Sequence, residues 1–415
     1  MQEDFWIYCA PISGGGLVTQ LGMMCEIYEA RKILNGGVLN GRKTYTPNLG
    51  LAASGGNVSL YIGEAGDWTT HGILRCAKQL DPKSFSRKWV PKDLSIVPNI
   101  VVGLCQGSLY RQGYGAGYLF SKLFNQETIC RTEIWTGTYN SDLKSAQFFC
   151  NKNKYDSQVN EIFFNDEQSL FDSLRLKFMN GNIELISEVA IASASIPLIV
   201  PNQKIENVMY ADGGCMYPSP LPVFSNEIYR IIINETSIPK SSKLIYKNNV
   251  IQEEILNSWQ EEKNYTVYAD GTYIPICGTF TPSMGHHKNL RLIYFMPYQA
   301  DRINLKKETV IEKETDVIGQ ILHASMLRDR NTGIDILNRL SSDISHTFFP
   351  EMNYIKLGSL LCELSKFKHY MICFNPHGHP SISLTHFTSE DVMKRINETR
   401  NGYSVSVWYS KEKIK

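Results

Sequence analysis

The sequence predicts an α/β fold in which most strands of one sheet run parallel. Two stretches of the chain predict it. A buried strand over Phe5–Ile12 leads through a glycine-rich turn into a helical pattern, and a second strand over Asn48–Ala53 does the same. Successive strand–turn–helix units bring each new strand back in the same direction, so they favour a parallel sheet.

Each of these units has recognisable start and stop signals. In the first, apolar residues recur at helical spacing from Leu17 to Ile27, and Asn35-Gly36-Gly37 ends the pattern. In the second, Asn57–Ala65 is apolar on most sides, which predicts a helix buried within the fold.

The remaining elements are predicted from the same patterns. Between Asp67 and Gly117 we expect one or two short helices and a long connection. Further strands are expected over Thr132–Thr138, Ala146–Cys150, Tyr229–Asn234, Leu290–Met296, Tyr370–Phe374 and Tyr403–Tyr409. Further helices are expected over Glu184–Ser195, Thr315–Leu327, Ile334–Leu340 and Ser389–Thr399.

Composition limits the kinds of partner. Lys and Arg total 42 against 41 for Asp and Glu, so no net charge draws the chain to nucleic acid or to an anionic membrane, and we expect no nucleic-acid partner. The start of the chain does not read as a secretory signal, and no stretch has the roughly 18–20 apolar residues of a spanning helix. The ten cysteines form no CxxC pair. We therefore expect a cytoplasmic location.

Ser54 is the first candidate for chemistry. It follows a predicted strand and precedes a predicted helix, and Ala52 and Gly56 are the small residues that a nucleophile elbow needs on either side of its serine. Gly55 is equally small. Serines flanked by small residues are also common in ordinary turns, so this pattern alone leaves both interpretations open.

The second candidate is Ser13-Gly14-Gly15-Gly16, between the first strand and its helix. Consecutive glycines let backbone N–H groups converge on one oxygen, as an oxyanion hole requires. A phosphate-binding loop would need Gly-Lys-Ser or Gly-Lys-Thr, and the following residues contain no lysine. A tight strand–helix connection is the alternative.

The third candidate is Asp212, in Tyr210-Ala211-Asp212-Gly213-Gly214. An aspartate held against a serine can accept its proton without a histidine. The chain contains a control, because Tyr268-Ala269-Asp270-Gly271 repeats the first four letters without the second glycine. We interpret Asp270 as a turn residue and Asp212 as a candidate base.

Together, the triple-glycine loop, the small-x-Ser-x-Gly elbow and the late Asp-Gly-Gly resemble the patatin-like phospholipase family. The nearest likeness is Ala192–Pro222, which is similar to that family's Ala-Ser-x-Ala-x-Pro stretch and its aspartate. The resemblance covers about Phe5–Asn234, with weaker agreement over Leu290–Met296. It implies a three-layer α/β/α fold and a Ser–Asp dyad that hydrolyses acyl esters of lipids.

Carried over by position, the resemblance implies Ser54 as nucleophile, Asp212 as base, and Gly14, Gly15 and Gly16 as the oxyanion hole. It implies supporting roles for Ala52, Gly55, Gly56, Gly213 and Gly214. The sequence departs from the family in two places: Ala52 stands where glycine is usual, and Val18 and Thr19 stand where a basic residue and a glycine are usual.

The same resemblance guides the domain assignment. We expect a catalytic domain over residues 1–345, with a core of 5–234 and 290–340 and an insertion at about 235–289. The insertion should contain a hairpin over Thr266–Ile274, because Asp270-Gly271 suits a two-residue turn. Residues 346–415 should form a short α/β extension packed on the same domain.

Other motifs indicate less. His377 and His379 could form part of a metal site, but no third ligand is near in sequence, and no calcium-loop pattern occurs, so no metal and no cofactor are expected. Cys105 and Cys215 are expected to be buried thiols. Gly113–Gly117 resembles a cofactor loop only superficially. Trp68 and Trp89 are either membrane anchors or packed residues.

The function implied is hydrolysis of glycerophospholipids, of phospholipase A or lysophospholipase type, with peripheral contact to a membrane. Two alternatives remain at this stage: a hydrolase of neutral lipids or soluble esters with the same dyad, and a non-catalytic lipid-binding protein on the same fold. Members of the family include cellular enzymes, host-delivered bacterial effectors and viral proteins. No pattern in the sequence identifies a protein activator.

Overall fold

The structure is a computed structural model of the 415-residue chain. It describes residues 3–34, 45–87, 108, 110–112, 120, 122–124, 131–153, 176–197, 199–215, 246–247, 250–251, 265–267, 273–275, 288–297, 330–338, 340–341, 343–378, 382 and 387–414. The predicted strand at 229–234 and the predicted helix at 315–327 lie outside these residues, as do Trp89, Cys105, Gly113–Gly117 and Asp270.

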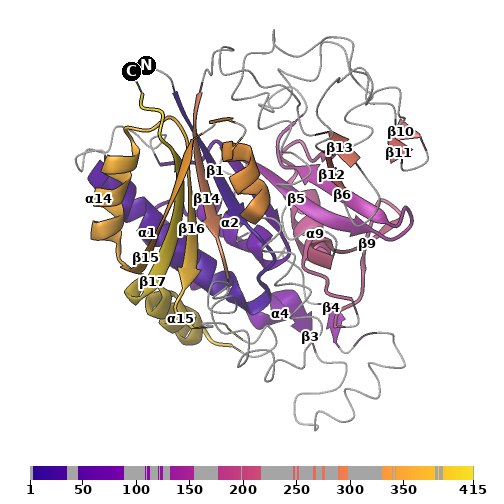
Figure 1. The fold of residues 1–415 in the computed structure, drawn as a ribbon. Coiled ribbons are helices and arrows are strands. Elements are labelled where there is room, and N and C mark those ends of the chain that lie inside the picture. Colours follow the sequence, from indigo (N-terminus) through magenta and orange to yellow (C-terminus); the bar gives the residue numbers. More distant parts are fainter. Residues whose placement is uncertain are drawn as a thin grey trace, which may run out of the picture.

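One mixed sheet organises the described part of the chain (Figure 1). Its central strands all run parallel, as predicted. In spatial order they are β16 (Tyr370–Pro376), β14 (Lys288–Phe295), β1 (Glu3–Ala10), β2 (Leu49–Ala53) and β5 (Glu133–Asn140). These strands are buried on both faces, which explains why they read as apolar runs rather than as an alternating pattern.

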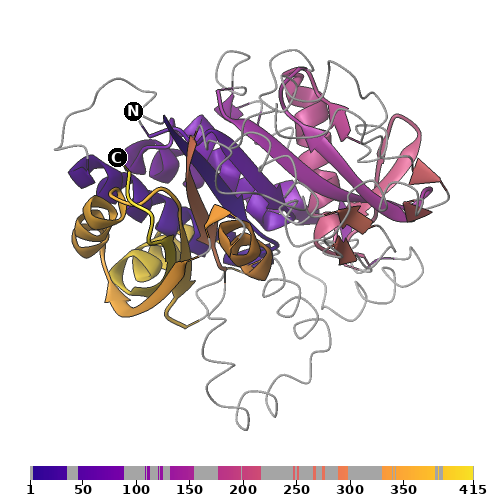
Figure 2. The same cartoon turned by 45° about the horizontal axis from the view of Figure 1, so that its top comes forward.

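Strands of mixed direction complete the sheet on both sides. Beyond β16 lie β17 (Tyr403–Ser410) and then β15 (Ile344–Met352), and beyond β5 lie β6 (Ser145–Cys150) and β7 (Leu176–Phe178). The colours of Figure 2 follow this order, with the yellow C-terminal strands at one side, the indigo strands in the middle and the magenta strands at the other side. The C-terminal residues therefore contribute three strands to the same sheet, and the predicted boundary at residue 345 falls inside β15.

A short branch of the sheet brings a distant segment to the centre. β8 (Gln203–Ile205) pairs with β9 (Val208–Asp212), and β9 pairs antiparallel with the last part of β5. β9 lies on the same side of β5 as β2 and begins pairing where β2 stops. This arrangement matters because β9 ends at Asp212.

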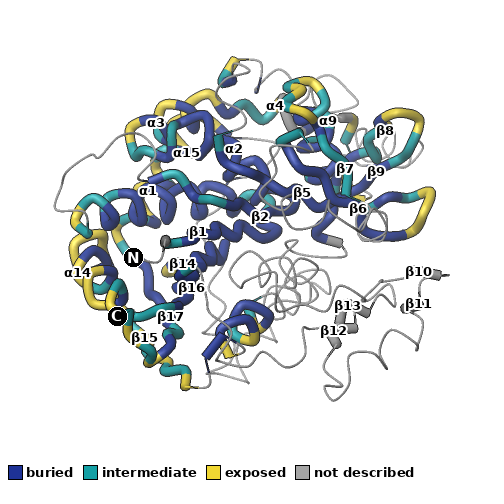
Figure 3. The backbone as a smooth tube through the Cα atoms, turned by 90° about the horizontal axis from the view of Figure 1, so that it is seen from above, coloured by how far each residue is buried: buried dark blue, intermediate teal, exposed yellow. Residues whose placement is uncertain are grey.

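Most described helices cover one face of the sheet, as the view from above shows (Figure 3). These helices are α1 (Leu17–Leu34), α2 (Gly55–Ala65), α3 (Thr70–Ala77), α9 (Ile183–Ser193), α14 (Tyr354–Leu364) and α15 (Ser389–Asn401). A further helix over residues 330–338 lies against the opposite face, where Gly333 contacts Leu292 and Met371. A short helix, α4 (Pro82–Phe85), leads to β3 (Ser86–Arg87), which pairs with β4 (Arg111–Gln112).

Helix α1 is buried on nearly all sides because α2, α3, α14 and α15 surround it. Its charged residues are accordingly paired. Glu26 accepts hydrogen bonds from Arg400 and Tyr403, which ties α1 to α15 and β17. Arg31 lies over the ring of Trp6, 3.9 Å from its centroid, and donates to the Tyr8 hydroxyl. These contacts fix α1, and with it the glycine loop from which it starts.

Most elements predicted within the described residues are confirmed. In the insertion, β12 (Tyr265–Val267) and β13 (Tyr273–Pro275) pair antiparallel, which confirms the predicted hairpin. Thr266 lies opposite Ile274, whereas a two-residue turn at Asp270-Gly271 would place Val267 there, so the register is not the one predicted. The insertion also contains the strand pair β10 (Tyr246–Lys247) and β11 (Val250–Ile251). β15 and α14 were not predicted. No helix among the described residues is long and apolar enough to cross a membrane.

Candidate active site

Ser54 occupies a sharp turn between β2 and α2. Its backbone angles are φ 54° and ψ −134°, a conformation that costs a residue with a side chain of the order of 1–3 kcal/mol. The turn is possible because Gly56 packs directly on β1: a methyl group there would overlap the carbonyl oxygens of Ala10 and Pro11. Ala52, two residues before the serine, is fully buried in β2. The geometry is that of a nucleophile elbow.

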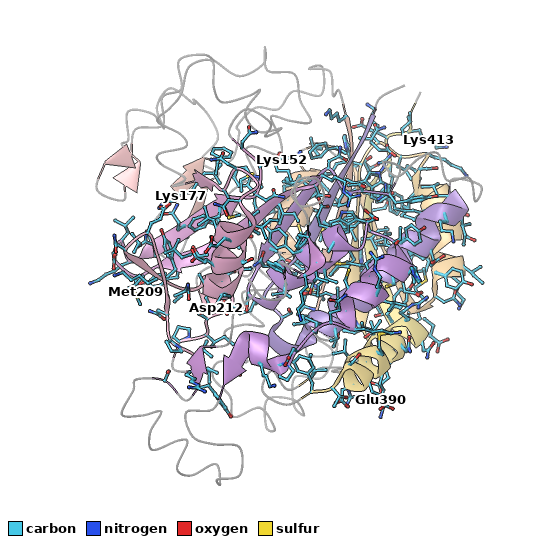
Figure 4. The ribbon with its side chains drawn as sticks, turned by 180° about the vertical axis from the view of Figure 1, so that it is seen from behind. Lys152, Lys177, Met209, Asp212, Glu390 and Lys413 are labelled. Atoms are coloured by element: carbon cyan, nitrogen blue, oxygen red, sulfur yellow. The ribbon has the colours of Figure 1, made fainter. Side chains whose placement is uncertain are left out.

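Asp212 accepts a hydrogen bond from the Ser54 hydroxyl, with 2.7 Å between Oγ and Oδ2. The sheet brings the two residues together. The β2–β5 ladder ends with Ala53 opposite Gly137, and the next residue of β5, Thr138, is opposite Asp212 on β9. Figure 4 shows the course of β9, which runs from Met209 near the periphery to Asp212 nearer the centre.

The Asp212 carboxylate is fully buried beside the serine. Burial raises the pKa of this carboxyl to about 7, although hydrogen bonds from Ser54 and from the Gly214 amide lower it. The Gly214 amide donates to Oδ1 across 2.8 Å, so the two carboxylate oxygens have separate partners. A base whose pKa is near neutral can take a proton from serine and return it to a leaving group.

Gly213 and Gly214 have to be glycines for reasons of space. A methyl group at Gly213 would overlap the Gly137 carbonyl, and one at Gly214 would overlap the side chain of Ile12. The turn η3 (Gly213–Cys215) therefore fits between β5 and the end of β1.

The glycine loop forms a single turn, η1 (Gly14–Gly16), against the elbow. A methyl group on Gly55 would lie 2.6 Å from the Ser13 hydroxyl oxygen and 3.0 Å from the Gly14 nitrogen. Within the loop, the Gly16 amide donates to the Ser13 carbonyl, and the Leu17 amide donates to the Gly14 carbonyl. The Gly16 amide is therefore occupied within the loop, unlike those of Gly14 and Gly15 in the hydrogen bonds described.

The C-terminal part of the chain contacts this loop. The Ile382 amide donates to the Gly15 carbonyl across 3.2 Å, and a methyl group on Gly15 would overlap the Ile382 carbonyl. Val18 and Thr19, at the positions where the family usually has a basic residue and a glycine, are fully buried in α1.

Two buried side chains behind the loop were not recognised in the sequence. The Gln20 amide donates to the carbonyls of Pro11 and Phe295, at the ends of β1 and β14. The Ser59 hydroxyl bonds with the Gln20 side chain and with the carbonyls of Leu17 and Gly55. These contacts join the glycine loop to the elbow helix, and no motif in the sequence marks them.

Two serines at the end of α9 were not recognised from the sequence as part of the site. Ser193 accepts the Ser54 amide through its hydroxyl, and the Ser195 carbonyl accepts the Asp212 amide. Both members of the dyad are thus held by one helix end. The signal that could have found Ser193 is a single polar residue directly after the apolar run Val189–Ala192.

Other candidate sites receive no support from the described residues. Among them, no group of three His, Cys, Asp or Glu side chains could hold a metal ion. His377 contacts the Pro350 carbonyl, and His379 lies outside the described residues. Trp68 is buried, and its indole donates to Glu64 and Thr132, so of the two interpretations left open for it the packed residue is confirmed.

Comparison with known proteins returned no relatives: no family model matches the sequence, and no curated protein matches it.

Proposed function

We propose that the chain is a lipid acyl hydrolase that cleaves fatty-acyl esters of glycerophospholipids, of phospholipase A or lysophospholipase type, on a patatin-like three-layer fold. The observation that carries the proposal is the 2.7 Å hydrogen bond from the Ser54 hydroxyl to Asp212, made at a strained strand-to-helix turn. An ordinary turn has no need of a buried carboxylate against its serine, because burial of a charge is costly.

In the proposed reaction, Ser54 Oγ attacks the ester carbonyl carbon while its proton passes to Asp212. The amides of Gly14 and Gly15, with the N-terminus of α2, stabilise the oxyanion. The carbon–oxygen bond of the ester then breaks, and Asp212 gives the proton to the departing alcohol. Water, activated by the same carboxylate, cleaves the acyl-serine and releases the fatty acid.

The order of elements supports a patatin-like arrangement. The glycine loop follows β1, the elbow follows β2, and the Asp-Gly-Gly turn follows β9, so all three lie at strand ends near the same part of β5 and β1. Helices on one face and the helix at 330–338 on the other support three layers.

A reducing, cytoplasmic location is part of the proposal. None of the described cysteines Cys9, Cys25, Cys76, Cys150, Cys362 and Cys373 is in a disulfide, which supports it. Contact with the membrane would be peripheral, from the aqueous side.

The test is fatty-acid release from vesicles of mixed phospholipids, from a triacylglycerol emulsion and from a soluble short-chain ester, each with calcium and with chelator. Ser54→Ala provides the blank, and Ser187→Ala, a buried serine of α9 that bonds only within its helix, provides the matched control. Chelator-resistant release of fatty acid from phospholipid by wild type and Ser187→Ala, but not by Ser54→Ala, is the expected result.

Other outcomes would change the assignment. Release from triacylglycerol or the soluble ester alone would favour the neutral-lipid or soluble-ester hydrolase. Vesicle binding without any release by wild type would favour the non-catalytic lipid-binding protein.

A further inference from the structure

The carboxyl-terminal end of α9 contacts the backbone of both members of the dyad. The Ser54 amide donates to the Ser193 hydroxyl across 2.8 Å, and the Asp212 amide donates to the Ser195 carbonyl across 3.0 Å. The end of helix α9 therefore also helps to set the distance between Ser54 and Asp212, in addition to strands β2, β5 and β9.

Ser193 does more than accept one bond. Its hydroxyl donates to the Gly137 carbonyl across 2.6 Å, and Gly137 is the β5 residue opposite Ala53. The β2–β5 ladder ends at this pair. Beyond it, the Ser193 hydroxyl connects the two strands, because it accepts a hydrogen bond from the Ser54 N–H and donates one to the Gly137 carbonyl of β5.

The Ser193 hydroxyl holds the backbone of Ser54, whose conformation is unfavourable for a residue with a side chain. Ser54 has φ 54°, and its amide is fully enclosed with the residue only 1% exposed. A buried amide without an acceptor is costly, so removal of the hydroxyl favours rotation of the peptide between Ala53 and Ser54. Rotation of that peptide moves Ser54 Oγ relative to Asp212 and to the glycine loop.

We infer that Ser193 is a positioning residue of the reaction, whose hydroxyl fixes the Ser54 backbone in the reactive conformation. The inference rests on the proposed function. Ser193 does not contact the Asp212 side chain in the hydrogen bonds described, so its removal should slow the reaction without changing which base is used.

The experiment measures the second-order rate at which an alkyl fluorophosphonate labels the full chain. In that step Ser54 Oγ forms a bond to phosphorus, the phosphorus–fluorine bond breaks, fluoride leaves, and Asp212 takes the serine proton. The variants are Ser193→Ala, Ser193→Thr, which keeps the hydroxyl, and the control Ser187→Ala, whose hydroxyl bonds the Ile183 carbonyl across 2.6 Å in the same helix. Thermal unfolding is recorded for each.

Ser193→Ala is expected to label about 10- to 100-fold more slowly than wild type, since small misplacements of reacting groups cost about this much. Ser193→Thr should recover most of the rate, Ser187→Ala should keep it, and the pH profile of Ser193→Ala should have the wild-type midpoint. If Ser193→Ala does not fold, Ser193→Cys, with a weaker hydrogen-bonding group, is measured in its place with the same expectation of slower labelling.

A wild-type labelling rate in Ser193→Ala, or in Ser193→Cys where that variant is used, overturns the inference, even if the unfolding temperature falls. A loss of rate in Ser187→Ala equal to that in Ser193→Ala also overturns it, because the effect would then belong to the helix as a whole. Absence of labelling at Ser54 in wild type would instead contradict the proposed function, and the inference would fall with it.

Discussion

Ser54 directly follows Ala53, the last β2 residue paired with β5, and Asp212 pairs with the next β5 residue, although 158 positions separate Ser54 from Asp212 in the chain. β2 occupies this edge of β5 as far as Gly137, and β9 occupies it from Thr138 onward. Ser54 and Asp212 meet at the point where β2 stops pairing with β5 and β9 starts. The geometry of the dyad therefore depends on strand register, which a packed sheet fixes closely.

The reaction should depend on pH through Asp212. Its pKa is raised to about 7 by burial, and the proposed base must be ionised to take the serine proton. We expect kcat/KM to rise with pH through about 7 and then to level off. Steady-state rates on a soluble ester between pH 5 and 9 measure this profile. A rate that is flat from pH 5 upward would indicate an ordinary aspartate or a different base.

Asp212→Asn should abolish the reaction and should gain stability relative to wild type as pH rises. In the folded protein the carboxyl keeps its proton up to about pH 7, whereas in the unfolded chain it loses it near 3.9. The wild type thus loses stability as pH rises between these values, and the variant lacks this loss. Relative to wild type, Asn should gain roughly 1–4 kcal/mol between pH 4 and pH 8.

Denaturant unfolding of both proteins at pH 4.5 and pH 8 measures how the difference in unfolding free energy between wild type and Asp212→Asn depends on pH. The difference between the two proteins isolates Asp212 from the other carboxyls. A difference that does not change between the two pH values would show that the carboxyl titrates normally. A rate for Asp212→Asn within about tenfold of wild type would remove Asp212 from the mechanism.

Gly56→Ala should prevent the elbow from forming correctly. The added methyl would overlap the carbonyls of Ala10 and Pro11, so we expect a loss of roughly 2–4 kcal/mol and of nearly all activity. Gly137→Ala is the matched control, since its methyl would meet only ordinary contacts at 3.6 Å or more and should change stability by less than about 1 kcal/mol. Equal effects of the two substitutions in thermal unfolding would contradict the packing argument.

Gln20 and Ser59 should contribute to the stability of the fold jointly rather than independently. Gln20→Met keeps the volume but leaves the carbonyls of Pro11 and Phe295 without the donor they share, at a cost of about 1–3 kcal/mol. Ser59→Ala should lose less, and the double variant should lose less than the sum. A double-mutant cycle measured by urea unfolding decides this. Strict additivity would mean that the two side chains act independently.

Most of the central fold could be predicted from the sequence because the local patterns there are strong. β1 is apolar from Phe5 onward, β2 contains only apolar residues and glycine, and glycines mark the turns that follow both. The sequence of β15 has no such pattern. It is an edge strand with partly exposed residues on both faces and Pro350 near its end, so its pattern is not that of a buried strand.

The pairing of Ser54 with Asp212 was predicted from the sequence, but the contacts that support it were not. Ser54 and Asp212 stand in turns with distinctive neighbours, which local sequence can reveal. The Ser193 bridge, the Gln20–Ser59 contact and the Ile382 contact with Gly15 join segments distant along the chain, so only the folded arrangement reveals them. The use of the Gly16 amide within its own turn is likewise a matter of backbone geometry.

The central claim is that Ser54 becomes acylated during turnover. The most direct measurement is acid quenching of the full chain during hydrolysis of an acyl ester, followed by mass mapping of its peptides, with Ser54→Ala beside wild type. The account predicts the acyl group on the peptide containing Ser54, and neither acylation nor turnover in Ser54→Ala. Turnover that persists in Ser54→Ala, or an acyl group carried by another residue, would contradict it.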